Sequence, residues 1–167
     1  MEKALDSLLS RDIQFVLLGT GGRRYQELFT QVQLKYPQKV GLKIAFDDSL
    51  AHRVIAGADM VLLPSRYEPS GLTQIYSLKY GTIPIVRATG GLKDTIQEFE
   101  PKTGRGNGLV FGPYEVADLL EAVDRAVAYF HRQEEWQTLV NNAMAADFSW
   151  ARSAPAYLDL YQKLLVG

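Results

Sequence analysis

The residues with the clearest chemical potential lie in one short segment, which reads PSRYEPSGLTQ from Pro64 to Gln74. It follows an apolar run at 60–63 that predicts a buried strand, and it precedes a predicted helix over 71–80. Open α/β sheets bind their ligands at the carboxyl ends of the strands. Glu68 therefore stands where a carboxylate could face a ligand, on a loop that two prolines restrict.

The backbone beside Glu68 predicts an anion site. The first N–H groups of a helix have no partner inside the helix and bind anions such as phosphate. Here we assign those groups to Gly71, Leu72 and Thr73. Because a carboxylate is poorly suited to bind phosphate, Glu68 is expected to face another part of the same ligand.

Two glycine segments and one aromatic residue are predicted at the same edge of the sheet. Gly19-Thr20-Gly21-Gly22 follows the first predicted strand and could admit a phosphate to the backbone, but its spacing fits a plain tight turn equally well. Thr89-Gly90-Gly91 follows another strand, where adjacent glycines serve either a ligand or a turn. Phe46 ends a third strand; its ring could stack on a nucleobase, although a core position is the better prediction for a phenylalanine.

The candidate cations near these segments are Arg23, Arg24 and Arg87, and at least one of the first two is expected to be solvated. A zinc-type metal site is not expected, because the chain has no cysteine and its two histidines, His52 and His131, are far apart.

Strands and helices are predicted to alternate along the chain, which indicates an α/β fold: a Rossmann-like parallel sheet with flanking helices and a helical tail. The whole chain, 1–167, is interpreted as one domain, and the helical start at 4–9 suggests a piece of a longer protein. The stretch 87–113 is predicted to be mostly loop. The predicted strands span 13–18, 40–46, 60–63, 83–86 and 108–111, and the predicted helices 4–9, 25–36, 48–56, 71–80, 115–131, 133–145 and 150–165.

Charge and hydrophobicity limit the classes of partner that we expect for this chain. A net charge of −1 gives no global attraction to nucleic acid or an anionic membrane. No apolar run approaches the ~20 residues of a membrane span, and the start lacks the apolar core of a signal peptide. A cytosolic location is the default expectation.

The segments PSRYEPSGLTQIYSLKY (64–80) and GTIPIVRATGGLKDT (81–95) closely resemble bacterial glycogen synthases and plant starch synthases. FVLLGTG at 15–21, AHRVIAGADMVLLPSR at 51–66 and GNGLVF at 106–111 extend the resemblance over nearly the whole chain.

The resemblance implies the C-terminal, donor-binding half of a GT-B glucosyltransferase that moves glucose from ADP-glucose to the non-reducing end of an α-1,4-glucan with retention. Glu68 would be the catalytic glutamate that contacts the donor sugar. Gly71, Leu72 and Thr73 would hold the distal phosphate, Thr89, Gly90 and Gly91 would lie near the diphosphate and glucose, and Phe46 would stack on adenine. Gly19 and Gly21 complete the predicted donor site.

The resemblance also defines what this chain lacks. The acceptor domain, the first strand of the donor domain and the donor-phosphate Arg and Lys would precede the chain, so the domain alone is expected to be inactive. Tyr76 stands where the wider superfamily often has a second glutamate. Neither a cofactor nor a metal is expected, and the location would be bacterial cytoplasm or a plant plastid.

Two alternatives remain open from the sequence. One is a related retaining glycosyltransferase that uses a UDP- or GDP-sugar, because the residues around Phe46 do not define the base. The other is a non-catalytic module that binds a nucleotide sugar without turnover.

Overall fold

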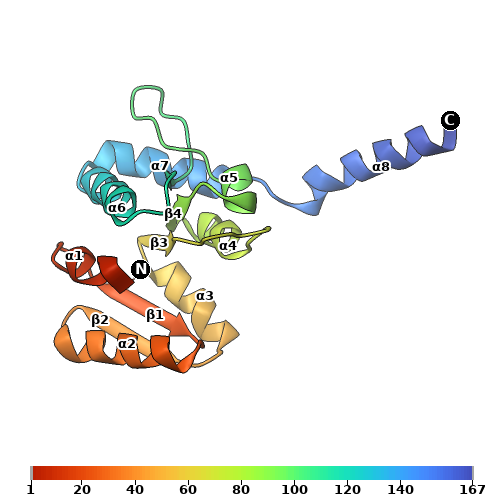
Figure 1. Cartoon of the computed structure of the whole chain (residues 1–167). Coiled ribbons are helices and arrows are strands. Elements are labelled where there is room, and N and C mark those ends of the chain that lie inside the picture. Colours follow the sequence, from red (N-terminus) through yellow and green to blue (C-terminus); the bar gives the residue numbers. More distant parts are fainter. Residues whose placement is uncertain (1, 167) are drawn as a thin grey trace.

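The strands form two parallel sheets. The computed structural model describes residues 2–166 (Figure 1). One sheet has the order β1-β2 and the other β3-β4-β5, and all pairs are parallel. The strands are β1 (Phe15–Gly19), β2 (Val40–Ile44), β3 (Met60–Leu63), β4 (Ile83–Arg87) and β5 (Leu109–Phe111). The α/β class with a parallel arrangement is therefore confirmed.

The helices lie close to the predicted positions, with one addition. Helix α5 (Gly90–Thr95) lies in the stretch predicted as loop. The sequence did not predict it because six residues are too few to show a helical period. The others are a 3-10 turn (Glu2–Ala4), α1 (Leu5–Leu9), α2 (Arg23–Lys35), α3 (Asp48–Gly57), α4 (Thr73–Tyr80), α6 (Val116–Phe130), α7 (Gln133–Ala145) and α8 (Trp150–Val166).

Local chemistry explains where helices α3 and α4 begin or end. The Asp47 carboxylate accepts the Leu50 N–H at 2.8 Å and caps α3. Gly81, with φ of 77°, ends α4 in the left-handed conformation that glycine adopts without strain.

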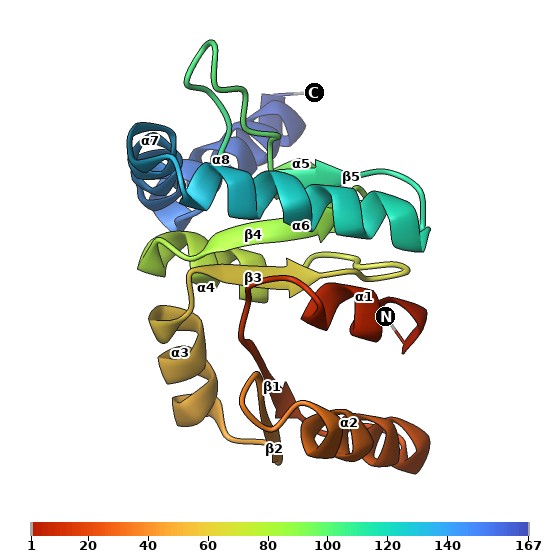
Figure 2. The same ribbon diagram turned by 90° about the vertical axis from the view of Figure 1, so that its left-hand side faces the viewer.

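Within residues 2–166 the parallel strands fall into two sheets rather than a single one. Strand β1 pairs only with β2, and β3 pairs only with β4, so each keeps one unpaired edge (Figure 2). Val16 of β1 is 57% exposed, and all four residues of β3 are only half-buried, whereas β4 is buried up to Val86. The split follows because no strand within residues 2–166 pairs with both β1 and β3.

Helix α1 joins the two halves of the molecule. Its Leu8 packs in the larger core, which β4, β5, α6 and α7 share. Its Leu5 and Leu9 pack in a smaller core with Val32 of α2 and Val40 of β2. A helix of five residues thus contributes side chains to both cores.

Helix α8 extends away from the rest of the molecule (Figure 1). Most of its described apolar side chains are exposed, among them Trp150, Leu158 and Leu164. None of the described helices is long and apolar enough to cross a membrane.

Candidate functional site

The loop between β3 and α4, residues 64–72, is held by hydrogen bonds from outside the loop. The Gly91 N–H donates to the Glu68 carbonyl at 2.9 Å. The Gln74 amide donates to the carbonyls of Ser70 and Gly71 at 2.9 and 3.0 Å. Glu68 itself is half-buried, and its carboxylate forms no ion pair among the described residues. The loop backbone is therefore fixed while the carboxylate remains available.

Gly90 and Gly91 are required by this loop. A Cβ on Gly90 would lie 2.0 Å from the Glu68 carbonyl oxygen, and a Cβ on Gly91 would lie 2.1 Å from that of Ser70. Gly90 also has φ of 44°, which disfavours other residues. The sequence left two explanations for these adjacent glycines, contact with a ligand or the geometry of a turn. The structure supports backbone geometry, because the Glu68 loop packs where a Cβ would lie.

The start of α4 differs from the prediction. The helix begins at Thr73, with Leu72 at the N-cap, so only Thr73 of the three predicted residues lies within it. Gly71 has φ of 74° and belongs to the preceding turn, which the Gln74 side chain holds through the Ser70 and Gly71 carbonyls. The free helical N–H groups thus begin at Thr73, and Gly71 and Leu72 contribute as turn backbone.

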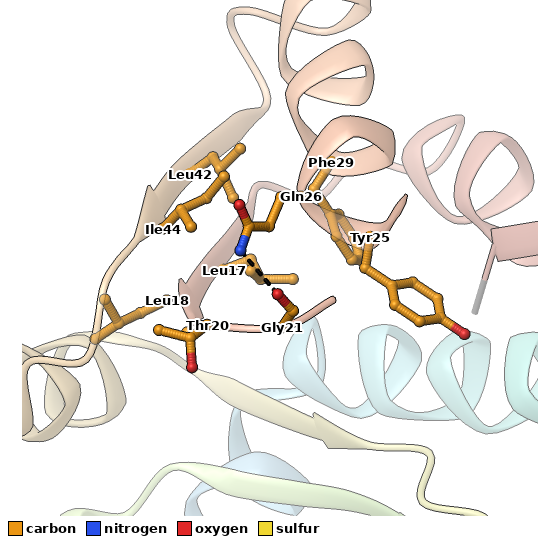
Figure 3. Close-up of a pocket in the computed structure, with 10 residues that line it drawn as sticks. Leu17, Leu18, Thr20, Gly21, Tyr25, Gln26, Phe29, Leu42 and Ile44 are labelled. Atoms are coloured by element: carbon orange, nitrogen blue, oxygen red, sulfur yellow. Dashed lines mark hydrogen bonds between the residues drawn. The ribbon is translucent and has the colours of Figure 1, made fainter. Parts of the chain in front are cut away.

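The turn Gly19–Gly22 is open to solvent beside a shallow pocket. Figure 3 shows the side chains that line this pocket, with the Gln26 amide donating to the Gly21 carbonyl at 2.7 Å. A Cβ on Gly19, Gly21 or Gly22 would meet no atom within 4 Å, and none of these glycines has a positive φ. Neither packing nor backbone conformation therefore requires glycine here, which is compatible with a ligand approaching the bare backbone.

Phe46 does not lie in the core, so the core prediction is wrong. It follows the end of β2, and 89% of the residue is exposed. The reason is its position beyond the last paired residue, Ile44, which leaves its ring without a neighbouring strand to cover it. An aromatic ring in this position is available for stacking.

The three candidate cations are engaged by other groups of the protein. Arg23 pairs with Glu27 and Arg24 with Glu2, each at 2.7 Å, and both arginines are largely exposed. Arg87 donates instead to the carbonyls of Arg66 and Gly112, at 2.7 and 3.2 Å.

The structure assembles the predicted site residues into two groups. Gly19 pairs in register with Ile44, so the turn with Gly19 and Gly21 and the aromatic Phe46 follow the carboxyl ends of β1 and β2. Leu63 pairs with Val86, so the loop with Glu68 and the segment Thr89–Gly91 follow the carboxyl ends of β3 and β4. The two groups belong to different sheets.

Sequence reasoning missed Gln74, a fully buried polar residue that shapes the loop. Its spacing gave a signal: Gln74, Ser77 and Leu78 are three and four residues apart, so they share the buried face of α4. A polar residue on a buried helical face normally bonds to something specific.

The chain belongs to a glycosyltransferase family. The family described as Glycosyl transferases group 1 matches residues 2–143. Among curated relatives, the chain is 52% identical to a glycogen synthase from Pseudothermotoga lettingae, over 99% of this chain and 34% of that protein. It is 50% identical to a glycogen synthase from Fervidobacterium nodosum, over 98% of this chain and 34% of that protein. The chain thus spans about a third of the length of these relatives.

Solved structures agree with this assignment. The catalytic domain of starch synthase IV from Arabidopsis thaliana, bound to ADP and acarbose, matches with a TM-score of 0.86 and 33% identity, over 96% of this chain and 34% of that one. Sucrose-phosphate synthase from Thermosynechococcus elongatus matches with a TM-score of 0.70 and 24% identity, over 99% of this chain and 42% of that one. The second likeness supports the fold alone.

Proposed function

We propose that the chain is the donor-binding, C-terminal domain of a glycogen or starch synthase, which transfers glucose from ADP-glucose to the non-reducing end of an α-1,4-glucan with retention. The observation that carries the proposal is the fixed loop that presents Glu68 at the carboxyl ends of β3 and β4. The identity of 52% to a glycogen synthase and the likeness to a starch synthase bound to ADP and acarbose support this choice of reaction.

In this proposal each group of site residues binds one part of the donor. Glu68 contacts the glucose and stabilises positive charge that develops as the leaving group departs. The free N–H groups at the start of α4, beside Gly71 and Leu72, receive the distal phosphate. Thr89, Gly90 and Gly91 support this end of the donor, chiefly by allowing the Glu68 loop to pack closely.

The nucleotide binds at the other group. Gly19 and Gly21 leave open backbone beside the diphosphate, and the exposed Phe46 ring stacks on adenine. One carboxylate does not provide the pair used by double-displacement glycosidases. By likeness to the family, the acceptor hydroxyl is instead deprotonated with help from the leaving phosphate, on the same face of the sugar. The reaction requires no metal and no further cofactor.

The rest of the parent protein completes this domain and supplies the acceptor site. A complete doubly wound sheet has six strands in the spatial order 3-2-1-4-5-6. In that order, strands β2 and β1 of this chain correspond to positions 3 and 2, and strands β3, β4 and β5 correspond to positions 4, 5 and 6. The place between β1 and β3 is that of the first strand, which the parent chain contributes from outside these residues. The α-glucan binds on the separate acceptor domain, so the isolated chain is inactive. The protein works in the cytoplasm, away from membranes and nucleic acid.

Calorimetric titration of this chain with ADP, UDP and GDP tests the choice of donor. Binding of ADP alone, lost in Phe46→Ala, is the expected result. Equal binding of all three would contradict selectivity for adenine and leave the donor base open, because stacking on Phe46 tolerates any base. If none binds, the same titration of the parent protein decides the donor.

A further inference from the structure

We propose that Arg87 is a positioning residue that holds the Glu68 loop in place from outside the loop. The inference rests on the proposed function, in which Glu68 faces the donor sugar. Arg87 is the last residue of β4. Its guanidinium donates to the Arg66 carbonyl at 2.7 Å through Nη1 and to the Gly112 carbonyl at 3.2 Å through Nε. One side chain thus ties the loop after β3 to the segment after β5.

The ring of Tyr114 supports this guanidinium. The guanidinium carbon of Arg87 lies 5.4 Å from the ring centre, and that of Arg66 lies 5.6 Å from the same ring. Both distances are within the range of cation–π attraction. Neither arginine forms an ion pair among residues 2–166. Arg87 is therefore held by carbonyl oxygens and an aromatic face, and these contacts define its orientation.

The bond from Arg87 completes a regular pattern along the loop. The carbonyls of Arg66, Glu68 and Ser70 each accept a hydrogen bond from a group outside the loop. The donors are the Arg87 guanidinium, the Gly91 N–H and the Gln74 amide. Arg87 holds the side that precedes Glu68, and the other two hold Glu68 and the side that follows it. Without Arg87, the segment before Glu68 loses its hydrogen bond from outside the loop and keeps the contact of the Arg66 guanidinium with Tyr114.

This role differs from that of a cation for the donor diphosphate, and two substitutions separate the roles. Arg87→Lys keeps the charge but loses the planar fork that reaches two carbonyls. Arg66→Ala removes the neighbouring positive charge but keeps the Arg66 carbonyl that Arg87 binds. Positioning predicts that Arg87→Lys is damaging and Arg66→Ala mild. If the positive charge of these arginines instead serves the donor diphosphate, Arg87→Lys should be mild and Arg66→Ala damaging.

Amide exchange in this chain tests the position of the loop directly. The Gly91 N–H lies in the first turn of α5, where it has no helical partner, so its protection depends on the bond to the Glu68 carbonyl. We expect Arg87→Lys to lower the protection of Gly91 by about fivefold or more, and Arg66→Ala to leave it within about twofold. Unchanged protection in Arg87→Lys would overturn the proposal.

Kinetics of the parent enzyme test the consequence for Glu68. We expect Arg87→Lys to lower kcat by about 10- to 100-fold, as for a misplaced catalytic group, with the KM for ADP-glucose changed less than kcat. A raised KM with normal kcat would overturn positioning in favour of a charge role. Glu68→Ala is measured alongside. If Glu68→Ala retains normal turnover, the proposed function of Glu68 fails, while the Gly91 exchange still decides whether Arg87 holds the loop.

Discussion

At the residue scale, glycines that look alike in the sequence have different roles. Gly90 and Gly91 lie against the backbone of the Glu68 loop, where a Cβ would approach within 2.0 and 2.1 Å of carbonyl oxygens. Gly21 lies in an open turn where a Cβ would meet no atom within 4 Å. The first two are needed for folding this region, and the third is available to a ligand.

This difference predicts opposite effects on stability. Gly91→Ala should lower the free energy of unfolding by about 2 kcal/mol or more, because the new methyl group collides with the Ser70 carbonyl and forces the backbone to move. Gly21→Ala, the matched control, should change it by less than about 0.5 kcal/mol. Urea unfolding of the two variants measures both values. Equal stabilities would contradict the close approach of the loop to Gly91.

At the scale of elements, the short α1 and the residues after it link the two halves of the chain. Leu8 packs in one core, and Leu5 and Leu9 in the other. Beyond the helix, Arg11 binds Asp124 of α6 through two hydrogen bonds, at 2.5 and 2.7 Å. The bidentate geometry orients the segment that leads from α1 into β1 against α6.

The Arg11–Asp124 pair predicts a pH dependence of stability. The Arg11 guanidinium lowers the pKa of the Asp124 carboxyl below its ordinary value. A lowered pKa in the folded state stabilises the protein above the ordinary value, about 3.9, and that contribution disappears as the pH falls through the folded pKa. Asp124→Asn should therefore lower stability at pH 7 by roughly 0.5 kcal/mol, since the pair is partly solvated.

Unfolding of the wild type and Asp124→Asn across the acid range checks this expectation. The two curves should converge at low pH, where Asp124 is protonated. Asp94→Asn, which changes an exposed aspartate on α5, serves as the control and should follow the wild type. A constant difference between the curves at all pH values would mean that the ion pair is not the cause.

At the scale of the whole molecule, two apolar surfaces lack a partner within the described residues. One is the unpaired edge of β1, with Val16 exposed. The other is α8, which extends from the body of the molecule (Figure 1). Its exposed apolar side chains recur at helical spacing: Trp150, Tyr157, Leu158, Leu160, Tyr161, Leu164 and Leu165. Exposed surfaces of this kind favour association.

The isolated chain should therefore self-associate through α8. Sedimentation velocity at increasing concentration should give a rising weight-average sedimentation coefficient, because dimers bury the apolar face of α8. Leu158→Lys combined with Leu165→Lys should keep the chain monomeric. Val16→Lys provides the control at the β1 edge and should leave association through α8 intact. A wild-type chain that remains monomeric throughout would contradict the prediction.

The sequence by itself determined the kinds of elements and their order. The apolar run at 60–63 and the predicted helix at 133–145 depend on neighbours along the chain, and the structure confirms both. The family was also recognisable, because the long block at 64–95 carries many residues in fixed spacing.

The tertiary structure alone decided which strands pair and what each loop residue touches. The split sheet, the exposure of Phe46, the close packing on Gly91 and the carbonyl bonds of Arg87 all join segments distant in the sequence. Helix α5 was missed since six residues show no clear period. Local patterns specify a residue's immediate conformation, but burial and hydrogen bonding across strands depend on contacts that form only when the chain is folded.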